Sequence, residues 1–83
     1  MRTSHKLLLR FFYDKNFDFS KVLVGYIDRG TPGDISYASG DEICNLDSNY
    51  FEVISKNTTK PIPYHRLLII SYGGIIIWER EVP

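Results

Sequence analysis

The sequence predicts an α+β fold in which an N-terminal helix packs on a small, mainly antiparallel sheet that includes a C-terminal β-hairpin. Three features predict it: helical spacing of apolar residues near the N-terminus, alternation over 21–29, and two β-prone runs joined by Gly73-Gly74. We expect one domain over residues 1–83, because 83 residues bury only about three-fifths of their unfolded surface and no composition change marks a boundary.

Composition and charge narrow the class of protein. With 43% hydrophobic and 14% aromatic residues, the chain has enough core formers to fold. Ten basic and ten acidic residues cancel, which excludes a protein that coats nucleic acid by charge alone. Cys44 is the single cysteine, and no Cys/His set has zinc-ligand spacing, so we expect no disulfide, metal or cofactor. No apolar stretch approaches the roughly 20 residues of a membrane span, and we expect a cytoplasmic protein.

The first predicted element is a short helix that Ser4 caps. Its apolar face repeats at three-to-four-residue spacing and comprises Leu7, Leu8, Phe11 and Phe12. We expect this face to cover one side of the sheet, with His5 solvated on the first turn and without a role.

The middle of the chain predicts two strands. In 21–29, Val22, Val24 and Tyr26 share one side, and Gly25 marks a bulge or a close helix contact. The turn-forming residues of 30–40 predict a loop or a weak edge strand, and 50–55 predicts a second strand. The residues between them, 42–47, suit a helical turn equally well, and the prolines in 57–63 predict an extended, unpaired approach.

The C-terminal hairpin supplies the candidate site. A two-residue turn at Gly73-Gly74 would pair Ile69 with Trp78 and Leu67 with Arg80, which places His65 and Arg80 on one face. Arg66 would point to the other face, towards Glu79 and Glu81. Asp28 and Arg29 would join the group if the first strand is a neighbour of the hairpin.

The chemistry of this group suits a phosphate. The planar fork of Arg29, Arg66 or Arg80 grips two oxygens, and His65 donates a hydrogen bond or moves a proton near neutral pH. The aromatic rings suited to stack a terminal base are Tyr26, Tyr64 and Trp78. The alternative is structural, since arginines at strand ends pair with carboxylates such as Asp28, and Trp78 also suits packing under the helix.

Three segments, 24–29 (VGYIDR), 62–66 (IPYHR) and 78–80 (WER), occur in this order and spacing. Together with the N-terminal helix and Tyr13-Asp14, they resemble a small archaeal domain family proposed to recognise RNA ends that carry a 2′,3′-cyclic phosphate, long catalogued as uncharacterised. Tyr13 stands where the family has Trp, and Glu79 replaces Asp. The resemblance marks seven positions as family residues: Asp28, Arg29, Pro63, His65, Arg66, Trp78 and Arg80.

The resemblance implies an RNA-binding module for RNA termini, acting in RNA processing or repair, with RNA-processing proteins as partners. Two alternatives stay open. One is an RNA phosphoesterase or end-modifying enzyme that uses His65, although no second acid or base is evident. The other is a protein-interaction scaffold in which the strand 75–77 or a sheet edge pairs with a partner.

Overall fold

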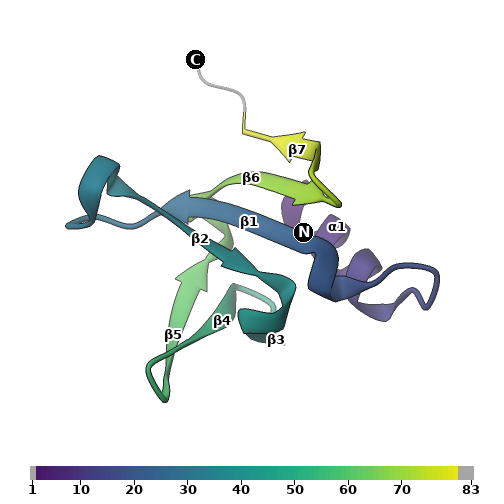
Figure 1. Cartoon of the computed structure of the whole chain (residues 1–83), viewed down its shortest axis with the longest axis horizontal. Helices are drawn as coiled ribbons and strands as arrows, with labels where there is room; N and C mark the ends of the chain where they lie inside the picture. Colours follow the sequence, from purple (N-terminus) through teal and green to yellow (C-terminus); the bar gives the residue numbers. More distant parts are fainter. Residues whose placement is uncertain (1, 81–83) are drawn as a thin grey trace.

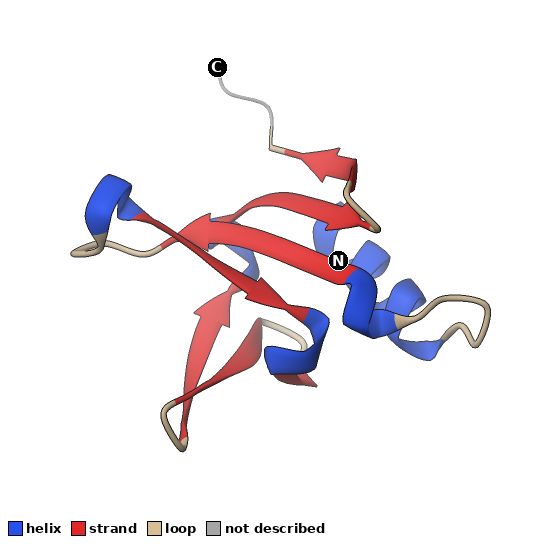
Figure 2. Ribbon diagram, viewed as in Figure 1, coloured by secondary structure: helices blue, strands red, loops and turns tan. Residues whose placement is uncertain are grey.

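The computed structural model describes residues 2–80 and confirms the α+β class (Figure 1). One helix, α1 (Thr3–Tyr13), is followed by seven strands: β1 (Val22–Ile27), β2 (Ile35–Ser39), β3 (Ile43–Leu46), β4 (Tyr50–Ser55), β5 (Thr58–Pro63), β6 (Leu67–Tyr72) and β7 (Ile75–Glu79). Four single-turn 3₁₀ segments connect them: η1 (Phe19–Lys21), η2 (Pro32–Asp34), η3 (Gly40–Glu42) and η4 (Tyr64–Arg66) (Figure 2).

The strands form two antiparallel sheets rather than the single sheet expected. The first has the order β2-β1-β6-β7 and the second the order β3-β4-β5. The chain leaves the first sheet at η3, where a Cβ on Gly40 would lie only 1.7 Å from the carbonyl oxygen of Phe19. Because backbone occupies that space, only glycine fits at this crossing point.

Helix α1 lies behind β1 and β6 in Figure 1 and covers the inner face of the four-stranded sheet. Leu8 and Phe11 are buried, whereas Phe12 is 46% exposed, so the apolar stripe is narrower than expected. The predicted Ser4 cap is wrong: Arg2 is the N-cap residue and makes no side-chain cap bond, while Ser4 is buried inside the first turn.

The core lies between α1 and the two sheets. Val22, Val24 and Tyr26 all point into it from β1, as predicted. Phe51 of β4 and Ile62 of β5 enter from the second sheet and are fully buried. Of the two alternatives for Gly25, the bulge is confirmed, because the β1–β6 register shifts between Gly25 and Tyr26.

Two ambiguous segments are strands. Within 30–40, β2 is an edge strand of the first sheet, which confirms one of the two alternatives, and most of 42–47 is β3. The expectation that 57–63 is unpaired is wrong, because β5 pairs with β4 along its whole length. Since β5 is an edge strand, its two prolines, Pro61 and Pro63, cost no ladder bond if their nitrogens face the open side.

The C-terminal hairpin is confirmed, but its register is not. Gly73 and Gly74 have φ of 57° and 86°, as a tight two-residue turn requires, and Ser71 pairs with Ile76 next to this turn. A bulge then adds one residue to β7. Trp78 consequently pairs with Ile70 rather than Ile69, and Glu79 pairs with Ile69.

Candidate functional site

His65 is displayed by a short turn that its neighbour anchors. In η4, Tyr64 is buried, donates its hydroxyl hydrogen to the carbonyl oxygen of Asp47 at 2.7 Å, and stacks on His5 with the ring centroids 4.1 Å apart. Burial raises the pKa of Tyr64 to about 12, so the hydroxyl stays a donor at neutral pH. With Tyr64 fixed inward, the adjacent His65 is turned towards solvent.

Arg80 reaches His65 by a route that differs from the predicted one. The bulge in β7 removes Arg80 from the face expected for Leu67, and its backbone N–H donates to the carbonyl oxygen of Leu68 at 2.8 Å. The guanidinium nevertheless donates from Nη2 to the backbone carbonyl oxygen of His65. The structure thus brings the predicted pair together, with Arg80 supporting the backbone that carries the imidazole.

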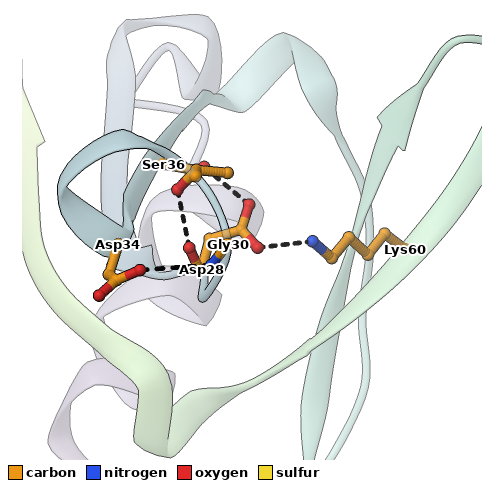
Figure 3. Close-up of polar contacts among 6 residues, drawn as sticks. Asp28, Gly30, Asp34, Ser36 and Lys60 are labelled. Atoms are coloured by element: carbon orange, nitrogen blue, oxygen red, sulfur yellow. Dashed lines mark hydrogen bonds and ion pairs between the residues drawn. The ribbon is translucent and has the colours of Figure 1, made fainter.

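Asp28 is the centre of a second polar group beside this turn (Figure 3). Its carboxylate accepts hydrogen bonds from Lys60 Nζ at 2.9 Å and Ser36 Oγ at 2.7 Å. These two bonds lower the pKa of Asp28, and the positive charge of Arg66 acts in the same direction. Because β1 and β6 are neighbours, the end of β1 lies beside the start of β6, as the expected adjacency required.

Arg66 and Arg29 differ in their surroundings. Arg66 is half-buried and forms no ion pair among residues 2–80, so the expected pairing with Glu79 is not seen, while Glu81 lies outside the described residues. Arg29 is exposed in the loop after β1, where Gly30 N–H donates to Asp34 Oδ1 at 3.3 Å. The described hydrogen bonds order the loop backbone and leave the Arg29 side chain facing solvent.

The three candidate stacking residues lie largely inside the protein. Tyr26 is buried and packs edge-to-face on Phe51 with the centroids 6.1 Å apart; Tyr64 packs on Phe51 and His5. Trp78 is half-buried against the core, in agreement with the packing alternative. Tyr26 and Tyr64 therefore support the strands that carry the polar residues, and their ring faces are covered by protein.

An open hollow of about 780 Å³ adjoins His65, which is within the usual size range of ligand pockets. It lies where the start of α1 meets the β3–β4 turn and the end of β5. Its polar lining residues are Arg2, His5, Ser48, Asn49 and His65. The remaining lining residues are Tyr50, Pro61, Pro63 and Tyr64.

His5 is the residue that sequence reasoning missed. It was expected in solvent, but it is only 4% exposed, and burial lowers its pKa. A signal was available, because position 5 lies three residues before Leu8, on the same side of the helix. Its contact with Tyr64, 59 positions later in the chain, was not visible in the sequence.

Within the described part of the chain, no group of three or more His, Cys, Asp or Glu side chains is placed to hold a metal ion. None of the helices over residues 2–80 is long and apolar enough to cross a membrane.

Comparison with known proteins identifies the class to which this fold and site belong. The model of the MJ1316 RNA cyclic group end recognition domain matches residues 1–80. A UPF0248 protein of Archaeoglobus fulgidus is 38% identical over 71 residues, covering 86% of this chain and 96% of the relative. The UPF0248 protein MK0350 of Methanopyrus kandleri is 32% identical over 68 residues, covering 82% of this chain and 86% of the relative. No solved structure matches the chain significantly.

The protein belongs to the family of the MJ1316 RNA cyclic group end recognition domain. The resemblance that the three sequence segments indicated is confirmed, and the relatives are archaeal proteins of the UPF0248 group.

Proposed function

We propose that the protein binds RNA termini, specifically 2′,3′-cyclic phosphate ends, through Arg29, His65, Arg66 and Arg80, and that it acts in RNA processing or repair in the cytoplasm. The family description supports RNA-end recognition. The observation that carries the assignment to these residues is the position of His65: its imidazole is exposed at the wall of an open hollow, and Arg80 bonds to its backbone.

Local charge supports the proposal despite the zero net charge of the chain. The Asp28 carboxylate bonds to Lys60 and Ser36 and forms no direct ion pair with Arg66. Arg29 is exposed on the loop that follows Asp28. A terminal phosphate held by one or two such side chains needs no extended basic surface, which fits recognition of an end rather than of a long RNA segment.

The direct test is fluorescence anisotropy with one short labelled RNA prepared with a 2′,3′-cyclic phosphate end or a 3′-hydroxyl end. We expect tighter binding of the cyclic phosphate end. His65→Ala and Arg80→Ala should each weaken it by about tenfold or more, as expected for a lost charge-assisted bond of ~1.5–3 kcal/mol. Arg10→Ala, an exposed arginine on the last turn of α1, is the matched control. Equal binding of the two ends would contradict the proposal.

One observation favours an enzyme as the second candidate. The sequence showed no partner for His65, but His5 lines the same hollow and supplies a second imidazole. In hydrolysis a neutral imidazole would take a proton from water as the water oxygen bonds to phosphorus and the P–O2′ bond breaks. The other ring, as an imidazolium, would give its proton to the 2′ oxygen. Chromatography of the RNA after the binding assay distinguishes a binding module from an enzyme. An intact cyclic end means that the protein only binds, and a hydrolysed end means that it is an enzyme.

The proposed partners besides RNA are RNA-processing proteins. The surface available to them is β7, an edge strand of the four-stranded sheet, on which Ile75 and Ile76 are 70% and 55% exposed. An edge strand with exposed apolar side chains is suited to pairing with a strand of another chain.

A further inference from the structure

The first turn of α1 lies at the hollow and carries no acidic residue. The helix has 11 residues, and its first intrahelical bond runs from Lys6 N–H to the carbonyl oxygen of Arg2 at 3.1 Å, so the N–H groups of residues 3–5 precede that bond. Among the residues that the structure describes, the N-cap side chain makes no bond to these groups, and no acidic residue occupies the first turn. Unbonded amides and the helix dipole make such an end favourable for an anion.

His5 independently indicates a ligand at the same place. Its side chain is only 4% exposed and lines the hollow. Among residues 2–80, none donates to or accepts from its ring nitrogens, yet no buried side-chain nitrogen there lacks a partner. The His5 ring is thus a largely buried polar group in the wall of the hollow. An imidazole in this wall can donate or accept a hydrogen bond from a ligand in the hollow.

The remaining polar lining suits a phosphate rather than a cation. Arg2 contributes a full positive charge, and Ser48 and Asn49 contribute hydrogen-bonding groups from the β3–β4 turn. No aspartate or glutamate lines the hollow among the described residues. His65, in η4 directly after β5, is the last of the polar residues that line the hollow.

We propose that this hollow is the seat of the terminal phosphate, in which Arg2, His5 and His65 hold a singly charged cyclic phosphodiester in preference to a doubly charged phosphomonoester. The inference rests on the proposed function and adds to it the two residues that precede the family segments, Arg2 and His5.

The preference follows from the charge inside the hollow. Burial lowers the pKa of His5, so its imidazole is neutral at pH 7 and offers one N–H donor rather than a second cation. A terminal phosphomonoester carries about −1.5 to −2 charges at pH 7, whereas a cyclic diester carries one. Arg2 and the helix end balance a single negative charge, and the second charge of a monoester would be left partly desolvated without a partner.

The test measures binding of one labelled RNA with three different ends: 2′,3′-cyclic phosphate, 3′-phosphate and 3′-hydroxyl. The variants are Arg2→Ala, which is exposed and outside the core, and His5→Phe, which keeps an aromatic ring against Tyr64 but removes both ring nitrogens. Arg10→Ala on the same helix controls for general loss of charge. Thermal unfolding establishes whether each variant is folded. If the His5→Phe variant does not fold, the binding data for Arg2→Ala alone decide the test.

We expect the wild-type protein to prefer the cyclic end over the 3′-phosphate end, and both variants to lose about tenfold in affinity for the cyclic end with little change for the 3′-hydroxyl end. Wild-type affinity in both variants, or an equal loss of affinity for all three RNA ends, would contradict the proposal that the hollow binds the terminal phosphate. If Arg80→Ala and His65→Ala still reduced binding in that case, the proposed function would survive without it. A wild-type protein that does not distinguish cyclic from hydroxyl ends would refute both.

Discussion

At the scale of single residues, Asp28 is the centre of a polar group at the end of β1. It accepts hydrogen bonds from Lys60, on β5, and from Ser36, on β2, and so connects the two sheets. The Lys60 side chain is 49% exposed, which limits the value of the ion pair through solvent screening. Asp28 therefore acts mainly by linking the end of β1 to β2 and to β5.

Asp28→Asn should lower the free energy of unfolding by up to about 1 kcal/mol at pH 7. The pKa of Asp28 is lowered in the folded protein, so its contribution is present above the ordinary carboxyl value of 3.8 and is lost as the pH falls through the folded value. Urea denaturation of both proteins at pH 7 and at about pH 3 should show the difference shrinking in acid. Asp41→Asn, on exposed η3, serves as the control. A difference that persists unchanged or grows in acid would contradict the role of Asp28.

At the scale of elements, α1 is fixed to the four-stranded sheet by an aromatic cluster. The ring of Phe11 stacks on Tyr72 of β6 with the centroids 5.0 Å apart and meets Phe17 edge-on at 4.5 Å. Since α1 also carries Arg2 and His5, this packing positions one wall of the hollow.

Phe11→Ala should cost ~3–5 kcal/mol, because it removes a buried ring and leaves a cavity. Phe12→Ala, the adjacent residue on the exposed side of the helix, should cost much less. Thermal and urea unfolding of the two variants provide the comparison. Similar losses for both would mean that α1 packs through a different face.

Local patterns predicted the elements that depend on local chemistry. The alternation of Val22, Val24 and Tyr26 and the Gly73-Gly74 turn were correct. Pairing over longer distances was not predictable in the same way: Pro63 suggested an unpaired segment because the sequence does not show that β5 is an edge strand. One added residue in β7 was enough to shift Arg80 by one position, since side chains alternate across a strand.

At the scale of the whole molecule, the hollow is assembled from parts of the chain that are distant in sequence. The start of α1, the β3–β4 turn and the end of β5 meet beside η4. The sequence predicted His65 and Arg80 as a pair, and they are neighbours in the structure. It did not predict Arg2 or His5 at the site, because the helix is placed there by tertiary packing on Tyr64 and Tyr72.

In the proposed complex, the RNA end occupies the hollow walled by His5 and His65. The most direct measurement is a two-dimensional NMR titration of the wild-type protein with a short RNA that ends in a 2′,3′-cyclic phosphate. We predict that the largest shifts fall on the imidazole and backbone signals of His5 and His65 and on the amides of the first turn of α1. Shifts confined to the outer face of the four-stranded sheet, around Leu23 and Tyr37, would contradict the claim.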